Sequence, residues 1–147
     1  MARRSRAREV ALQALFQEDV NPHASVRALN DFLSGRIADT ELQEFARSLV
    51  LGVKRNQEEL DQLLESVAQN WALSRMANTD RNILRIGAFE VRYSETPPKV
   101  AINEAVELAK RFGAAQSSQF VNGILDKLAQ QQDAPRQEAP YQEGEDE

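Results

Sequence analysis

The chain has 147 residues, about the length of one domain, and we expect it to form a single hydrophobic core. It contains no cysteine and one histidine, which excludes disulfides, thiolate metal sites, cysteine nucleophiles and multi-histidine metal sites. Its six glycines show no phosphate-loop spacing. The sequence therefore does not indicate an enzyme, and we expect neither a metal nor a cofactor.

The net charge of −5 is concentrated at the carboxyl end of the chain. Residues 130–147 carry six acids against the single Arg136, whereas residues 1–129 hold 17 bases and 17 acids. Within this neutral part, residues 1–10 carry four arginines against Glu9. A basic head and an acidic tail indicate interaction segments. The tail consists of glutamine, proline and acids with one aromatic residue, and we expect it to be disordered.

No part of the sequence approaches the roughly 18–20 apolar residues that a membrane-spanning helix needs. The basic start is similar to the beginning of an export signal, but Glu9, Gln13, Gln17 and Glu18 interrupt the apolar stretch that would have to follow. Together with the lack of cysteine, this predicts a cytoplasmic protein that does not associate with membranes.

Apolar residues at helical spacing predict the first two helices. The apolar stripe of the first helix consists of Ala7, Val10, Ala11, Ala14 and Leu15. Asn21 and Pro22 are predicted to end this helix and to begin the second, with Asn21 as N-cap and Pro22 at the first helical position. Gly35 is predicted to end the second helix.

Two capping patterns predict the third and fourth helices. Thr40 and Gln43 have the spacing of a capping box at the start of the third helix. Asn56 and Glu59 form a second N-cap signature, so we expect the third helix to end there and a fourth to follow. Trp71 lies in the connector after the fourth helix, where we expect it to anchor the core.

The fifth predicted helix is the central one. It begins at Asn78 or Thr79, and apolar residues occur around most of its surface. The residues predicted to be solvated are Asp80, Arg81, Arg85 and Arg92. We therefore expect this helix to be buried on most sides.

The proline pair at 97–98 ends the fifth helix and precedes a sixth, which is followed by Gly113 at the position of a left-handed C-cap. A last helix begins at Ser117 or Ser118. The sequence shows no strand pattern and no repeat at a fixed period. We therefore predict an all-α domain of six or seven helices.

The first candidate site is the arginine-rich head, whose basic residues are Arg3, Arg4, Arg6 and Arg8. Guanidinium groups pair with phosphates, stack on bases and keep their charge at any working pH. Arginine-rich segments often become ordered on binding RNA. The composition favours an RNA contact over the alternative, a solvated terminus that aids solubility.

The second candidate site surrounds the turn between the last two helices. Its members are Lys110, Arg111, Gln116, Ser117, Ser118, Gln119 and Phe120. Basic groups, amides, hydroxyls and the first N–H groups of a helix suit phosphates and bases. On spacing alone the alternative is favoured, in which Phe112 and Phe120 lie in the core and Ser117 is an N-cap.

Asp80 and Glu90 lie on the helix predicted to be central. Three roles are open to them: helix caps, ion-pair partners, or contacts to a basic partner. The residues alone do not decide among these roles. Acids elsewhere occur at helix-surface spacings, which are typical of solvated charges rather than of an acid–base pair. His23 is predicted to be exposed and without a catalytic role.

Three segments resemble the NusB family of transcription antitermination factors. They are Arg3–Phe16, Arg81–Glu90 and Pro98–Gly113, the last continued by Phe120–Asp126. The resemblance covers residues 3 to about 129 and leaves out the acidic tail. It implies a NusB-like fold of two small helical subdomains, with an RNA-binding domain over 1–129 and the disordered tail over 130–147.

The resemblance also implies a non-enzymatic function. Members of this family bind the boxA element of nascent RNA together with the ribosomal protein NusE, and help load the antitermination complex on RNA polymerase, especially during ribosomal RNA transcription. The head arginines and the turn from Lys110 to Phe120 correspond to the family's RNA-facing regions. Asp80 and Glu90 correspond to its NusE-facing helix.

In this interpretation the head arginines neutralise phosphates, while the turn from Gln116 to Phe120 reads or stacks unpaired bases. Gln116 stands where family members can carry an acid, so we expect comparatively tight RNA binding by the protein alone. The length disfavours an RNA-binding domain attached to a Rossmann-like methyltransferase. A protein–protein adaptor or homodimer with its RNA surface buried stays open as an alternative.

Overall fold

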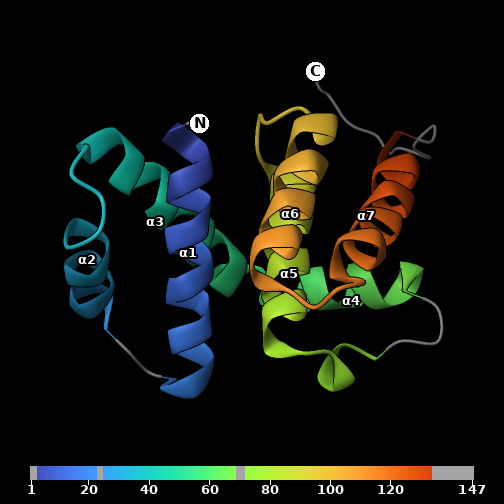
Figure 1. Ribbon diagram of the computed structural model, residues 1–147, viewed down its shortest axis with the longest axis horizontal. Coiled ribbons are helices and arrows are strands. Elements are labelled where there is room, and N and C mark those ends of the chain that lie inside the picture. Colours follow the sequence, from blue (N-terminus) through green and yellow to red (C-terminus); the bar gives the residue numbers. More distant parts are fainter. Residues whose placement is uncertain (1–2, 23–24, 69–71, 134–147) are drawn as a thin grey trace, which may run out of the picture.

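The computed structural model describes residues 3–22, 25–68 and 72–133, and this part of the chain consists of helices and turns without strands (Figure 1). The elements are α1 (Arg3–Val20), α2 (Val26–Ser34), α3 (Thr40–Arg55), α4 (Gln57–Val67), the 3-10 helix η1 (Leu73–Arg75), α5 (Asn78–Tyr93), α6 (Pro98–Phe112) and α7 (Ser117–Asp133). The all-α prediction is confirmed, with seven α-helices in the described residues.

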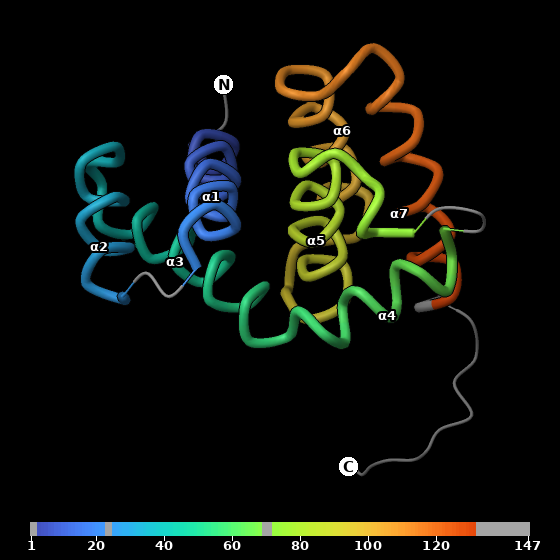
Figure 2. The backbone as a smooth tube through the Cα atoms, turned by 90° about the horizontal axis from the view of Figure 1, so that it is seen from below, coloured from blue at the N-terminus to red at the C-terminus, as the bar shows by residue number. Residues whose placement is uncertain are grey.

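The helices form two subdomains, which are visible in two perpendicular views (Figures 1 and 2). Helices α1, α2 and α3 pack together on one side, and α4, α5, α6 and α7 pack together on the other. Both α1 and α3 also contact α5, so α5 joins the two halves. The predicted pair of helical subdomains and the central position of the fifth helix are confirmed.

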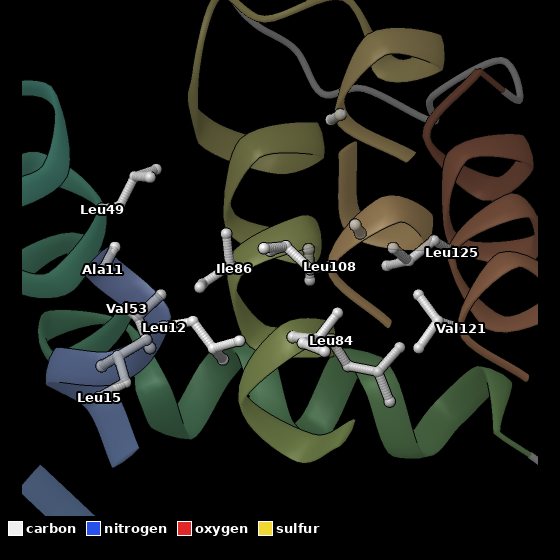
Figure 3. Packing of buried hydrophobic residues seen from close by; sticks show 14 of the residues in the cluster. Ala11, Leu12, Leu15, Leu49, Val53, Leu84, Ile86, Leu108, Val121 and Leu125 are labelled. Carbon is white, nitrogen blue, oxygen red and sulfur yellow. The ribbon is translucent and has the colours of Figure 1, made fainter. Parts of the chain in front are cut away.

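One continuous hydrophobic core joins the two subdomains (Figure 3). Leu12 and Leu49 face it from the first subdomain, and Leu125 faces it from the second. Helices α3 and α5 approach each other closely at Gly52, where a Cβ atom would lie 2.3 Å from Cζ of Phe89. Any side chain at position 52 would have to displace this ring, so the glycine sets the spacing of the subdomains.

The second helix begins later than predicted. Helix α2 starts at Val26 rather than at Pro22, and its N-cap is Ser25 instead of Asn21. The Ser25 hydroxyl accepts a hydrogen bond from the Ala28 N–H at 3.0 Å. Asparagine and serine are equally good N-caps, so local preference did not distinguish the two positions.

Helix α3 begins at Thr40, but its cap differs from the predicted capping box. Asp39 is the N-cap, and its carboxylate accepts a hydrogen bond from the Leu42 N–H at 3.0 Å. The Gln43 amide instead donates to the Ile37 carbonyl oxygen at 2.7 Å. Aspartate is at least as good a cap as threonine, and its charge also favours a helix N-terminus.

The predicted breaks at Gly35 and Asn56 are confirmed, although the Asn56 amide donates to the Gly52 carbonyl oxygen at 2.8 Å and does not cap α4. The proline pair 97–98 precedes α6 as predicted but does not end the fifth helix, which already ends at Tyr93. The left-handed cap predicted at Gly113 is wrong, because its backbone is extended, with φ −94° and ψ −176°. A Cβ atom at this glycine would lie 2.6 Å from the Cβ atom of Ser117. Close packing of the turn, and not backbone handedness, therefore excludes a side chain there.

Arg85, which the helical pattern placed in solvent, is buried in the structure, with 6% of its surface exposed. Its Nε and Nη2 atoms donate to the two carboxylate oxygens of Asp61 on α4, at 2.8 and 2.9 Å. This two-point contact anchors α4 to the central helix. The prediction of a solvated Arg85 is therefore wrong.

Some predictions fall beyond the described residues, among them the core position of Trp71, the exposure of His23 and the tail after residue 133. Helix α7 continues to Asp133, past the predicted end of the folded domain at residue 129. Among the helices of the described segments, none is long and apolar enough to span a lipid bilayer.

Candidate nucleic-acid interface

The first turn of α1 exposes arginines beside the start of α3. Arg3 forms an ion pair with Asp39, and the Arg4 guanidinium lies 4.3 Å from the centre of the Phe45 ring. The Leu42 N–H, and then the charge of Arg3, lower the pKa of Asp39 against the opposing effect of desolvation. These contacts hold two guanidinium groups at the surface without covering them.

Arg8 lies one turn further along the same face of α1, with its guanidinium 5.1 Å from the centre of the same Phe45 ring, but it is buried, with 3% of its surface exposed. Its Nε and Nη2 atoms donate to the two carboxylate oxygens of Glu90 on α5, at 2.7 and 2.8 Å. The Thr96 hydroxyl also donates to Glu90 Oε2, at 3.0 Å, and Glu104 Oε1 lies 3.5 Å from Arg8 Nη1. Arg8 therefore fastens α1 to the second subdomain and is not on the surface where the sequence placed an RNA contact.

The predicted role of Glu90 as a contact to a basic partner is corrected as well, because Glu90 is also buried. It is 1% exposed, and both of its carboxylate oxygens face donors of this chain. A residue in this position has no surface for a basic partner, so the ion-pair role left open by the sequence is the one that the structure supports.

Glu9 brings the two predicted sites together. Arg111, at the end of α6, donates from Nη1 to Glu9 Oε2 at 2.7 Å, and Arg6 donates from Nη1 to Glu9 Oε1 at 3.3 Å. The head of the chain and a segment 102 residues away in the sequence thus share one carboxylate. Lys110, the residue before Arg111, lies on the exposed side of α6, and its Nζ atom is 3.5 Å from Glu107 Oε2.

The turn between α6 and α7 contains both exposed and buried members of the second predicted site. The exposed members are Lys110, Arg111, Gln116 and Gln119, and the half-buried ones are Ser118 and Phe120. Ser117 is 4% exposed, and its hydroxyl accepts a hydrogen bond from the Ala114 N–H at 2.9 Å. Ser117 therefore holds the turn in shape instead of facing a ligand. Phe120 packs one side against the core.

A hollow lies between this turn and the start of α5. It is lined by Arg75, Met76, Asp80, Gln116, Gln119 and Phe120, among others. Among the described residues, Asp80 Oδ1 is a buried side-chain atom without a hydrogen-bond partner. A buried carboxylate oxygen in this state is costly, so the hollow suits a ligand or partner group that donates a hydrogen bond.

The model of the NusB family matches residues 5–130. This chain belongs to the NusB family. The transcription antitermination protein NusB of Anaeromyxobacter dehalogenans (strain 2CP-1 / ATCC BAA-258) is 46% identical over 129 residues, which cover 87% of this chain and 91% of the relative. The NusB protein of Myxococcus xanthus (strain DK1622) is 46% identical over 134 residues, 88% of this chain and 96% of the relative.

Solved structures of this family show the same fold. The T. maritima NusB structure has a TM-score of 0.78 and 34% identity, covering 88% of this chain and 92% of the other. A crystal structure of the antitermination factors NusB and NusE in complex with double-stranded RNA has a TM-score of 0.78 and 25% identity, covering 89% of this chain and 99% of the other. The NusB-like fold predicted from the sequence segments is confirmed.

Sequence reasoning missed two features of this NusB-family surface. The Phe45 ring contacts the guanidinium groups of Arg4 and Arg8, and sequence reasoning did not pair them because Phe45 lies far from both arginines in the sequence. Phe16 and Phe112 are 46% and 37% exposed and line one groove together with Thr79. The available signal was that Phe16 lies outside the predicted apolar stripe of its helix.

Proposed function

We propose that this chain is a non-enzymatic transcription antitermination factor that binds the boxA element of nascent ribosomal RNA together with the ribosomal protein NusE, and helps load the antitermination complex on RNA polymerase. The observation that carries the proposal is the meeting of the arginine head with the end of α6 at Glu9, in a chain of the NusB family. Such a function places the protein in the bacterial cytoplasm, where RNA is transcribed.

The surface has separate groups for the RNA backbone and for the bases. The guanidinium and ammonium groups of Arg3, Arg4, Arg6, Lys110 and Arg111 are exposed and neutralise phosphates. Gln116, Ser118, Gln119 and Phe120 contact unpaired bases by hydrogen bonding and stacking. Arg8 and Ser117 support this surface from below and make no contact with RNA in the proposal.

NusE binds, in this proposal, next to the RNA, at Asp80, which lines the same hollow as Gln116, Gln119 and Phe120. The buried Oδ1 atom of Asp80 accepts a hydrogen bond from a donor of this basic partner, which removes the cost of its unpaired state. The proposal is supported by the related structure in which NusB and NusE are bound together with RNA. Glu90 takes no part, because it is buried against Arg8.

The test is to measure binding of a boxA RNA and a scrambled RNA of equal length to the purified protein, with and without NusE, over a series of salt concentrations. The proposal predicts a preference for boxA that increases with NusE. Equal and steeply salt-dependent binding of both RNAs would contradict the base contacts. Absence of RNA binding in every state would contradict the function and favour the adaptor or homodimer.

A further inference from the structure

Glu9 is a buried acid at the centre of a surface that carries basic residues. Its side chain is 7% exposed, whereas those of its two partners, Arg6 and Arg111, are 47% and 59% exposed. Each carboxylate oxygen accepts a hydrogen bond from a different guanidinium group, at 3.3 Å and 2.7 Å. One carboxylate thus holds two arginines, from α1 and α6, next to each other.

A guanidinium group has five N–H donors in a planar arrangement, and each of these two arginines uses one for its bond to Glu9. The others are left for a second acceptor. Within this cluster two cations against one anion leave a net charge of one positive unit, while Glu104 and Glu107 on the same groove are paired with Arg8 and Lys110. The planar guanidinium groups suit the two non-bridging oxygens of a phosphodiester.

We propose that Glu9 is a positioning residue that joins Arg6 and Arg111 into one binding site for a single phosphodiester group of the RNA. The inference rests on the proposed RNA-binding function, and it adds the contact that holds two of the phosphate-binding arginines in place. Without the carboxylate, the two guanidinium groups repel each other and spread apart. The phosphate then has to order two long side chains that Glu9 otherwise holds in place.

A second acid on the same groove provides the contrast. Glu107 pairs with Lys110 three residues along α6, at 3.5 Å, and both side chains are largely exposed, at 69% and 60%. Such a pair on one helix surface fixes little. Glu107 and Glu9 both line the groove between α1 and α6 and carry the same charge, but only Glu9 connects the two helices.

This contrast gives opposite expectations for the same chemical change. Replacing either glutamate by glutamine makes the surface one unit more positive, which by long-range electrostatics alone tightens RNA binding. The positioning role of Glu9 predicts the reverse at that position. The sign of the effect therefore separates positioning from simple charge.

The experiment measures the affinity of a fluorescent boxA RNA for the full chain by anisotropy, over a series of salt concentrations. E9Q is expected to weaken binding about tenfold, because it loses preorganised charge-assisted contacts, and to reduce the salt slope by about 0.7, the value for one single-stranded phosphate. E107Q is expected to bind as tightly as the unaltered chain or more tightly. Adding R111A to E9Q is expected to cause little further loss.

Binding of E9Q that equals that of E107Q would overturn the inference and leave the RNA-binding function intact. Absence of boxA binding by the unaltered chain would instead overturn the proposed function and the inference with it. Thermal unfolding checks that E9Q is folded. If it is not, R111K keeps the charge and Glu9 but lacks the planar donors, and its RNA affinity is expected to fall several-fold; unchanged affinity would overturn the inference.

Discussion

Arg8, at the inner end of the arginine-rich run, and Arg3, Arg4 and Arg6, at its outer end, have opposite surroundings. Arg8 is 3% exposed and makes a two-point contact with Glu90 on another helix. The outer three are exposed and keep most of their donors toward solvent. The same residue type in one helical segment thus joins the two subdomains at the inner, buried end of the run and presents charge to solvent at the outer end.

A cluster of basic residues therefore forms a binding surface only where its side chains are exposed. A buried ion pair contributes modestly to stability relative to an apolar pair, but losing one partner leaves an unpaired buried charge. An exposed arginine contributes little to stability and much to the attraction of phosphates.

The largest effect is expected for R8A. It leaves Glu90 buried without its main partner, and the free energy of unfolding should fall by about 3–5 kcal/mol. Urea unfolding followed by circular dichroism measures this loss, with R3A as the control that should lose less than about 1 kcal/mol. Equal losses in the two variants would contradict the division of the arginines.

The next effect concerns RNA. A triple variant with Arg3, Arg4 and Arg6 changed to alanine should lose roughly 30-fold to 100-fold in boxA affinity, or about 2–3 kcal/mol, with little change in unfolding free energy. Its salt slope should become shallower by about 2, since each phosphate on single-stranded RNA contributes about 0.7. A salt slope equal to that of the unaltered chain would contradict phosphate contacts by these residues.

F120L sharpens the comparison at the second site, because leucine keeps the apolar contact to the core but removes the ring. Loss of base stacking should weaken boxA binding about tenfold, within the range of 1–3 kcal/mol known for stacked bases. The salt slope should stay constant. A fall in salt slope without loss of boxA preference over scrambled RNA would show that Phe120 does not contact bases.

A smaller effect is expected for Q116D at the exposed start of this turn. The added negative charge should reduce RNA affinity a few-fold by repulsion of phosphates, most clearly at low salt. Q116N, which changes size without charge, is the matched control. Unchanged affinity of Q116D would sink the idea that a neutral residue here favours RNA binding.

The smallest effect concerns Asp39. Its pKa is lowered by the Leu42 N–H and by Arg3, so its contribution to stability is present above its unfolded pKa of about 3.8 and is lost as the pH falls through the lower folded value. D39N should therefore have a slightly lower Tm than the unaltered chain at neutral pH. The difference should shrink as the pH falls below 3.8 and disappear only below the lowered folded pKa of Asp39. A constant difference would contradict the charge contribution of this cap.

Much of the fold could be predicted because its signals are local. Apolar spacing predicts α3 and α4 as separate helices and the proline pair predicts the start of α6, and these signals need only neighbouring residues. Errors arose where two good caps compete over a few positions, as with Asn21 and Ser25, or Asp39 and Thr40. Local cap preference does not separate Asn21 from Ser25, which are equally good N-caps.

The buried charges could not be predicted for a different reason. Arg8 and Glu90 are 82 positions apart, and Arg85 and Asp61 are 24 apart, so no local pattern pairs them. Helical periodicity places an arginine in solvent unless a partner is known. The role of Glu9 was hidden likewise, because Arg111 reaches it only in the folded chain.

The central claim is that the outer arginines of α1 and the α6–α7 turn form one RNA surface, with Arg8 beneath it. Photo-crosslinking of boxA RNA to the full chain, with mass-spectrometric mapping of the linked residues, tests this most directly. We predict crosslinks on residues 3–6 together with residues 110–120. Crosslinks confined to α2 and α3, or to only one of the two segments, would contradict the account.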